Sequence, residues 1–577
     1  MSETSVIAKA TLLRIAVMQG LMILGLFELF EAKIWPSQTP LLYFPLWTIV
    51  MTAPTLLLLS LEKGNERRAL TMVGQFTGVL MLLALYVGWQ AEPFAQFPIT
   101  NLTLIFALTL AIAVFKALMY IQQRAAQLPL SYHVLFTYSW RNFLVVAFTG
   151  FFVLACFLLL QLWAALFRVI DINFFTTLFS EPRFMIPALA LANGLGITIF
   201  RDLTRVIDTI TRLLQGMIKL LLPLVVLMSA IFVLALPFTG LTPLWATGNG
   251  TSLLLWLIAI ILFCSNAVYQ DGREKTPYPL LVHRIIYIGM CGLPILCSLS
   301  LYGLTLRLNQ YGFTIGRSWG LAVCLILSLF AIGYTVGIIS KRDEWPKMLA
   351  KVNTQMSIVV LMLMLLSNSP ALDFRKISLD SQLARLHSGE IELSNFDYYY
   401  AKQYLARPGH QAVEEIKSAL DESESDLLSL INSALPTSFA KKLPHKPEEI
   451  WHSMVYLPTN MEVPRALKRL MEQQPTMSAH AITADGRADA KSYLIELDLN
   501  EDGQFEYVLF KTFFQNVIEA NYFHLHSGDW RRSQLAFSRG QMLENIDFEE
   551  LYNKGEITIE VPAFHNIKIG ELVFTPN

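Results

Sequence analysis

The sequence predicts an α-helical polytopic membrane protein of about 11 spans that carries a C-terminal soluble α+β domain. Apolar runs of about 16–25 residues follow one another from Leu12 to Leu366, and each is near the ~20 residues that cross a hydrocarbon core. Apolar residues make up 54% of the 577-residue chain and charged residues only 15%. Near residue 370 the apolar runs end, and the chain continues to Asn577 with the composition of a soluble domain.

The apolar runs are predicted to be helices, because a strand exposed to lipid would leave backbone groups unpaired. They cover roughly 12–30, 41–60, 70–89, 99–119, 143–167, 185–200, 217–237, 252–268, 285–305, 318–339 and 353–368. The first run is predicted to stay uncleaved, since Glu28, Glu31 and Lys33 follow it in place of a signal-peptide cleavage site.

Basic residues alternate between the connections, which predicts the orientation of the chain. The basic set holds Lys63, Arg67 and Arg68; Arg124 and Arg141; Arg201, Arg205 and Arg212; Arg273, Lys275 and Arg284; and Lys341, Arg342, Lys347 and Lys351. Basic connections stay in the cytoplasm. The N-terminus is therefore predicted to be cytoplasmic. An odd number of spans then places the C-terminal domain in the periplasm, and the protein in a bacterial inner (cytoplasmic) membrane.

The soluble part is predicted to have two regions after the transmembrane domain. The chain divides into 1–369, the multi-span transmembrane domain; 370–475, the helical and loop part of the soluble domain; and 476–577, its β-rich part. Pro370 ends the last span, since proline cannot continue a helix. Alternation at Tyr493, Ile495 and Leu497 is typical of a strand.

Charge is distributed unevenly along the chain. From Asp373 onward there are 20 Lys and Arg residues and 31 Asp and Glu residues, which gives a net charge of −11. The preceding part has 24 Lys and Arg residues and 14 Asp and Glu residues, which gives a net charge of +10. An acidic tail lacks the basic stripe that nucleic-acid binding needs. The predicted partners are therefore the lipid bilayer and an envelope protein, and no nucleic acid.

Few charged residues lie inside the predicted spans. Lys116 is near the inner end of the fourth span, where its side chain could snorkel to the interface. Gln161, Asn193 and Asn266 are expected to form interhelical hydrogen bonds. A central carboxylate, typical of proton-coupled transport, is missing from the sequence of these spans, and no HExxH, P-loop or GxSxG motif occurs. The sequence favours a non-enzymatic protein without deciding the question, and it gives no catalytic residue.

A polar segment follows the ninth span. Arg307, Gln310 and Tyr311 are predicted at the outer mouth of that span. One interpretation is an interfacial anchor of aromatic and basic residues. The other is a contact for a lipid headgroup or anionic substrate, for which Arg307 would supply the charge.

The sharpest motif in the soluble domain is a DxNxDG loop. Its candidate metal ligands are Asp498, Asn500, Asp502, Gln504 and Glu506. Oxygen-bearing residues at this spacing, with Gly503 at position 6, begin an EF-hand-like calcium loop, but Leu509 at position 12 argues against a true EF-hand. The motif resembles the D-x-N-x-D-G-x-x-D/E loop of FG-GAP-type repeats. Two interpretations of the loop stay open: it binds a structural Ca²⁺ ion, or it is an Asx-rich hairpin turn without an ion.

Two segments carry a family resemblance, Tyr302–Trp319 and Ser369–Gly389. The second supplies Ser369, Pro370, Leu372, Asp373, Ser378, Ser381, Gln382, Arg385, Leu386, Ser388 and Gly389. In these motifs the chain resembles a bacterial membrane-protein family named domain of unknown function 4153. The resemblance implies a polytopic inner-membrane protein with a C-terminal domain, and implies no activity.

Two functional hypotheses follow. The first is an inner-membrane envelope protein whose periplasmic domain binds a partner or ligand. The alternative is a transporter or lipid-handling membrane protein with an accessory periplasmic domain. Polar residues that line a continuous cavity between the spans would favour the alternative, and a sealed bundle would favour the first.

Adding Ca²⁺ to the full-length protein is expected to raise the melting temperature of the C-terminal domain. An ion that binds only the folded loop would stabilise it by about 2.7 kcal/mol at a free concentration of about 100 times Kd. Asp498→Ala should remove the rise, as measured by calorimetry. A wild-type protein that melts at the same temperature with and without Ca²⁺ would contradict the calcium hypothesis.

Overall fold

The computed structural model divides the chain into two compact units. The residues that it describes are 9–93, 99–270, 277–420, 454–459, 461, 463–472, 492–499, 503, 505–513, 517–526, 529–535, 548–555, 557, 567–569 and 572–574. One unit comprises Met1–His387 with Ala401–Ile416, and the other comprises Ser388–Tyr400 with Lys417–Asn577.

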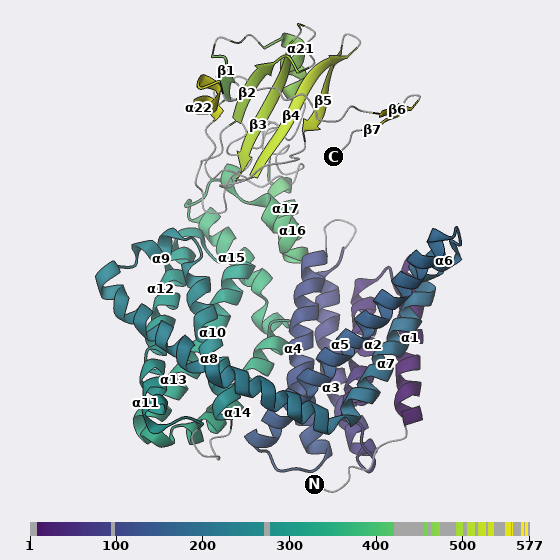
Figure 1. Ribbon diagram of the computed structural model, residues 1–577, viewed down its shortest axis with the longest axis vertical. Helices are drawn as coiled ribbons and strands as arrows, with labels where there is room; N and C mark the ends of the chain where they lie inside the picture. Colours follow the sequence, from purple (N-terminus) through teal and green to yellow (C-terminus); the bar gives the residue numbers. More distant parts are fainter. Residues whose placement is uncertain are drawn as a thin grey trace. The chain divides into compact units, whose positions relative to one another are not determined.

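The first unit is a bundle of long apolar helices (Figure 1). Its main helices are α1 (Lys9–Glu31), α2 (Pro40–Ser60), α3 (Glu66–Gln90), α4 (Thr100–Ala125), α5 (Tyr132–Val169), α6 (Phe174–Ser180), α7 (Pro182–Asp202), α8 (Thr204–Thr239), α9 (Thr242–Ala246), α10 (Gly250–Tyr269), α11 (Leu280–Met290), α12 (Leu293–Tyr311), α13 (Ile315–Lys341) and α14 (Pro346–Leu366). Among the described residues, 11 helical segments are long and apolar enough to cross a membrane, with α11 and α12 counted as one. The predicted fold class is confirmed.

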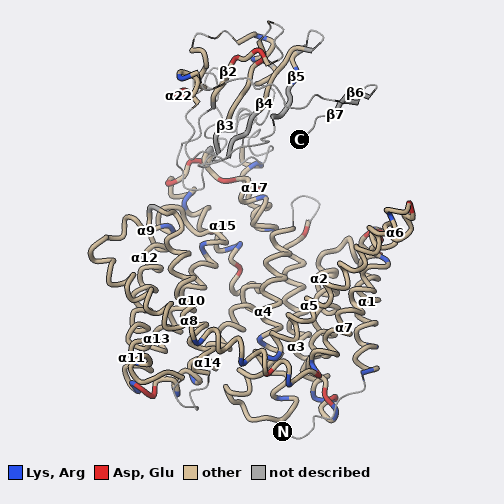
Figure 2. The backbone as a smooth tube through the Cα atoms, in the orientation of Figure 1, with Lys and Arg blue, Asp and Glu red and all other residues tan. Residues whose placement is uncertain are grey.

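Two spans differ in detail from the sequence prediction. The ninth run is broken between α11 and α12, where Gly292 precedes the helix-starting Leu293-Pro294 pair. The basic stretch before the seventh run, which contains Arg205 and Arg212, joins that run in α8, a continuous helix of 36 residues. Figure 2 shows many Lys and Arg positions along the backbone at the end of the bundle where α1 begins.

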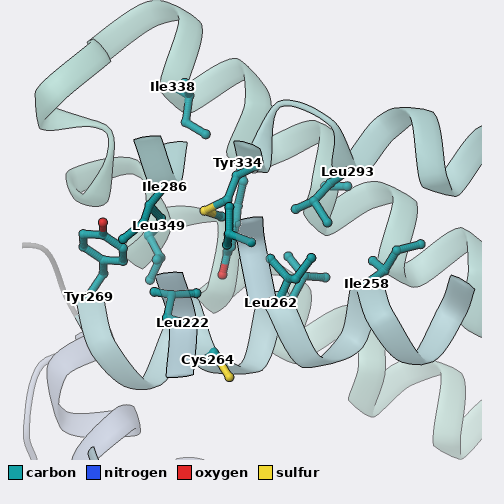
Figure 3. Close-up of a cluster of buried hydrophobic side chains, with 14 of the residues drawn as sticks. Leu222, Ile258, Leu262, Cys264, Tyr269, Ile286, Leu293, Tyr334, Ile338 and Leu349 are labelled. Atoms are coloured by element: carbon teal, nitrogen blue, oxygen red, sulfur yellow. The ribbon is translucent and has the colours of Figure 1, made fainter. Parts of the chain in front are cut away.

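The bundle has two lobes, and each has its own apolar core. We call α1–α7 the N lobe and α8–α13 the C lobe. The N-lobe core includes Leu12, Leu56 and Leu118, and the first turns of α8 also contact it. The C-lobe core includes Leu262, Ile286 and Tyr334 (Figure 3). Helix α14 packs on α13 of the C lobe and on α4 of the N lobe, so it joins the two.

Within the N lobe, α1 and α7 approach closely through small residues. An added Cβ at Gly20 would lie 2.8 Å from the Cβ of Ala190, and one at Gly194 would collide with Ala16. Ala16 and Gly20 are four residues apart, as are Ala190 and Gly194. This matched pair of small-xxx-small motifs lets two backbones pack directly in lipid, where the hydrophobic effect does not drive helices together.

After α14 the chain forms three further helices, α15 (Phe374–His387), α16 (Tyr398–Tyr404) and α17 (Ala406–Ser418). Helix α15 packs on α13, and the ring of Phe374 meets that of Trp319 edge to face at 5.0 Å. The segment that follows the last span is therefore part of the first unit up to His387.

The second unit contains a five-stranded mixed sheet together with helices, which agrees with the predicted α+β class. Its elements are β1 (Met454–Leu457), α21 (Arg465–Glu472), β2 (Ser492–Leu497), β3 (Glu506–Phe513), β4 (Val517–His526), β5 (Asp529–Leu535) and α22 (Phe548–Asn553), followed by the separate pair β6 (Ile567–Ile569) and β7 (Leu572–Phe574). The strand order is β1-β2-β3-β4-β5, with β1 parallel to β2 and the other pairs antiparallel.

Both faces of this sheet bury apolar side chains, because successive residues of a strand point to opposite faces. Leu494 packs on one face with Leu467 of α21, and Tyr493 packs on the other with Phe548 of α22. Burial, and then the hydrogen bond from its hydroxyl to Glu496, raise the pKa of Tyr507 to about 12. The tyrosine therefore stays a neutral donor across the physiological pH range.

Gly20→Leu is expected to destabilise the full-length protein by about 1–3 kcal/mol, because the added side chain forces α1 away from α7. The matched control is Gly78→Leu, since Gly78 is exposed and an added Cβ there meets nothing within 4 Å. Thermal unfolding in mild detergent measures the difference. Equal melting temperatures for the two variants would contradict the close approach of α1 and α7.

Candidate functional site

A cavity of about 380 Å³ lies between the two lobes. Helices α4 and α5 form its N-lobe side, and α10, α13 and α14 form the opposite side. Most of its lining is apolar, and the polar side chains in it are Lys116, Tyr132, Ser139, Asn266, Asn353 and Ser357, with the indole of Trp140. A mostly apolar cavity with a few convergent polar groups has the general character of a ligand site.

Four polar side chains form a network at one end of this cavity. The hydroxyl of Tyr334 lies 2.7 Å from Oδ1 of Asn353 and 3.0 Å from Oδ1 of Asn266. Nδ2 of Asn353 donates to the Tyr132 hydroxyl at 2.9 Å and also to Oδ1 of Asn266. Tyr334 is only 1% exposed and Asn353 is 6% exposed, so each depends on the others for hydrogen bonds.

This network joins α5 of the N lobe to α10, α13 and α14. It confirms the interhelical hydrogen bonding that we predicted for Asn266, whereas the side chains of Gln161 and Asn193 form no hydrogen bond with any residue that the structure describes. Tyr132 begins α5, Asn266 is near the end of α10 and Asn353 is near the beginning of α14. These ends all lie on the same side of the bundle, because consecutive spans alternate in direction.

Lys116 lines the cavity from α4 and is half-buried. It forms no hydrogen bond or ion pair with any residue in the described part of the chain. By helix geometry it lies roughly 12 Å along α4 from Arg124, which is at the end of the helix. A single lysine charge thus sits in a mainly apolar cavity without a protein counter-charge among the described residues.

Aromatic rings surround the mouth of the cavity. The ring of Trp140 lies 6.4 Å from that of Phe143 and 6.5 Å from that of Phe263. Phe143 is 53% exposed and Phe263 is 56% exposed. Both belong to apolar helices, so the mouth is on the surface that a membrane would cover.

The segment with Arg307, Gln310 and Tyr311 forms the C-terminal end of α12. Arg307 donates to the backbone oxygen of Gly248 at 2.6 Å, and Tyr311 O accepts from Arg317 at 3.2 Å. Gln310 O accepts from Arg385 at 2.9 Å. The three residues do not line the interlobe cavity, and their contact with a headgroup or anion stays a prediction.

The second family motif caps this same helix end. Gln382 donates to the oxygens of Tyr311 and Phe313 at 3.0 and 2.9 Å, and Ser381 accepts from the Phe313 amide at 3.0 Å. Gly312 has φ +68°, and an added Cβ would lie 2.9–3.0 Å from Gln382, Arg385 and Ser381. The Ser381-Gln382-x-x-Arg385 motif therefore attaches α15 to the end of α12 and the turn before α13, which contain Tyr311 and Gly312. The sequence contained both motifs but gave no sign of their contact.

Asp373, from the same motif, is the centre of a second buried polar cluster. Its carboxylate accepts hydrogen bonds from Tyr86 at 2.8 Å and Gln90 at 2.7 Å, both on α3. Arg375 Nε lies 3.2 Å from Asp373 Oδ1, and the two side chains are 6% and 1% exposed. This cluster ties the segment after the last span to the N lobe.

The DxNxDG loop joins β2 to β3 as a hairpin, with Leu497 paired to Glu506. Asp498 Oδ2 accepts from the Gly503 amide at 2.9 Å, and Glu506 Oε2 accepts from the Leu499 amide at 2.8 Å. Gly503 has φ +80°, which favours glycine. Asn500, Asp502 and Gln504 lie outside the described residues. Two carboxylates that flank one loop fit either a calcium loop or an Asx-type turn, and the ion stays a prediction.

The comparisons with known proteins identify a family for most of the chain. Residues 16–416 match the model of a domain of unknown function, DUF4153. No curated protein and no solved structure matches the chain. The matched segment contains all the candidate spans except the first turns of α1, and it ends before the five-stranded sheet begins. Because the match covers more than half of the 577 residues, the chain belongs to the DUF4153 family.

Proposed function

We propose that this protein handles lipid, and that it takes an amphiphilic molecule from the bilayer into the cavity between its lobes. The observation that carries this proposal is the cavity itself, which joins an aromatic mouth to Lys116 and the Asn266–Asn353 network. Apolar walls suit an acyl chain, and the polar side chains suit a headgroup. Of the two sequence hypotheses, this geometry favours the lipid-handling alternative.

The position of the cavity supports binding that is coupled to motion of the lobes. The lobes have separate cores, and α14 contacts both. A ligand that touches α4 and α5 on one side and α10 and α14 on the other binds both lobes at once. Its affinity would then depend on how the lobes are arranged, which is what a transporter or lipid-handling protein requires.

We also propose that the chain lies in a bacterial inner membrane with its N-terminus in the cytoplasm and its C-terminal domain in the periplasm. The alternation of basic connections and the odd number of candidate spans support this orientation. Reporter fusions at the C-terminus test it. A reporter that is active only in the periplasm should give signal, and activity of a cytoplasmic reporter would overturn the orientation.

A second function for the C-terminal domain is binding of an envelope protein partner or ligand. The second unit has its own buried core and most of it follows the family segment, which ends at residue 416. Affinity purification of the full-length protein in mild detergent tests this role. A protein that co-purifies in stoichiometric amount and is released by charge changes in the acidic tail would support it; lipid alone in the purified sample would count against it.

Val360→Trp is expected to weaken binding of an amphiphile about tenfold, because the larger side chain occupies the cavity that Val360 lines. Tenfold corresponds to about 1.4 kcal/mol. The matched control is Val359→Trp, since Val359 is 39% exposed and does not line the cavity.

The measurement is native mass spectrometry of the full-length protein with added fatty acid and phospholipid, and thermal unfolding checks that both variants fold. Equal binding of amphiphiles by Val360→Trp and the wild type would overturn the proposed function.

A further inference from the structure

We propose that the amphiphile is anionic and that its headgroup pairs with Lys116, assisted by the hydroxyls of Ser139 and Ser357. This inference rests on the proposed function and specifies the chemical class of the ligand. The class comprises amphiphiles with a carboxylate or phosphate headgroup, such as fatty acids and anionic phospholipids.

The first argument is the uncompensated charge. Ionised side chains within membrane spans are costly, and they usually pair with one another or mark the path of a substrate. Lys116 is half-buried, and no described residue pairs with it. The residues that line the cavity include no Asp or Glu. The cavity therefore has a formal charge of +1, which an anionic headgroup would neutralise.

The second argument is the pair of serine hydroxyls on opposite walls. Ser139 belongs to α5 and Ser357 to α14, and both line the cavity with Lys116. A serine inside a helix commonly donates to the carbonyl four residues earlier, as Ser300 does to Leu296 at 2.9 Å. Ser139 and Ser357 form no hydrogen bond with any residue that the structure describes. They remain available as donors to headgroup oxygens.

The third argument is size. At about 380 Å³, the cavity is near the lower end of the roughly 300–1,000 Å³ that is usual for ligand sites. It has room for a headgroup and the first part of one chain, but a whole two-chain lipid would extend beyond it. The remainder of the molecule would pass between Phe143 and Phe263 into the bilayer.

A snorkelling lysine is the competing explanation. Lys116 would then extend toward the interface near Arg124, roughly 12 Å away along the helix, and would have no ligand. The two explanations differ in a measurable way. A snorkelling lysine gives no preference for anionic amphiphiles that is specific to position 116.

The test is native mass spectrometry of the full-length protein with five defined amphiphiles. Oleate and dioleoyl phosphatidic acid represent the carboxylate and phosphate headgroups, and dioleoyl phosphatidylglycerol represents an anionic phosphodiester. Dioleoyl phosphatidylcholine and dioleoylglycerol are zwitterionic and neutral references. The wild type is expected to bind at least one anionic member about tenfold more tightly than both references. The anionic member with the highest affinity identifies the headgroup.

Four variants separate the explanations. Lys116→Met is expected to remove the preference for anionic amphiphiles, and Lys116→Arg is expected to retain it. Lys351→Met is the charge-matched control, because Lys351 is an exposed residue near the beginning of α14 that does not line the cavity. It should bind as the wild type does. Ser139→Ala combined with Ser357→Ala is expected to weaken anionic binding by a smaller factor than Lys116→Met.

Equal affinity of the wild type for anionic and reference amphiphiles would overturn the inference. An anionic preference that persists in Lys116→Met, or that Lys351→Met removes equally, would also overturn it. These failures are distinct from failure of the proposed function. If Val360→Trp lowers the binding of all amphiphiles while the wild type shows no charge preference, the cavity binds amphiphiles but Lys116 does not select their headgroup.

Discussion

Hydrogen bonding between polar side chains inside an apolar bundle is the interaction on which the arrangement of the two lobes depends. Tyr132, Asn266, Tyr334 and Asn353 come from four helices, and the side chains of Tyr334 and Asn353 are buried away from water. An unpaired amide or hydroxyl in that environment costs several kcal/mol. The hydrogen bonds of the network therefore form only when α5 contacts α10, α13 and α14. The cavity lies between the lobes beside this contact.

The family motifs have a structural role at the opposite end of the helices. Gln382 and Arg385 donate to backbone oxygens at the end of α12, and Asp373 accepts from two residues of α3. One short segment after the last span thus contacts the C lobe through α15 and the N lobe through Asp373. Asp373 also forms an almost fully buried ion pair with Arg375. The two lobes are therefore joined at both ends of the bundle, by the polar network at one end and by the segment after the last span at the other.

Much of the fold follows from the sequence, because the need to satisfy every backbone group in lipid leaves helices as the natural spanning elements. The number of spans and the strand alternation at Tyr493 agree with the structure, whereas the first unit continues past residue 370 to His387. The candidate site does not follow in the same way. Lys116 and Asn266 are visible as polar residues within apolar runs, but Ser139 and Ser357 resemble many helical serines. Nothing in the spacing of these residues shows that they face one cavity.

The sequence by itself determined the class of protein, the apolar helices, the family motifs and the uneven charge of the two parts, since each depends on local composition and period. Only the tertiary structure decided which polar residues meet. Lys116 and Ser357 are 241 positions apart and line one cavity, and Gly312 needs its small size because Gln382 lies above it. Such contacts depend on the rotation and depth of each helix. Packing between helices sets this rotation and depth, and the sequence of a single span gives little information about that packing.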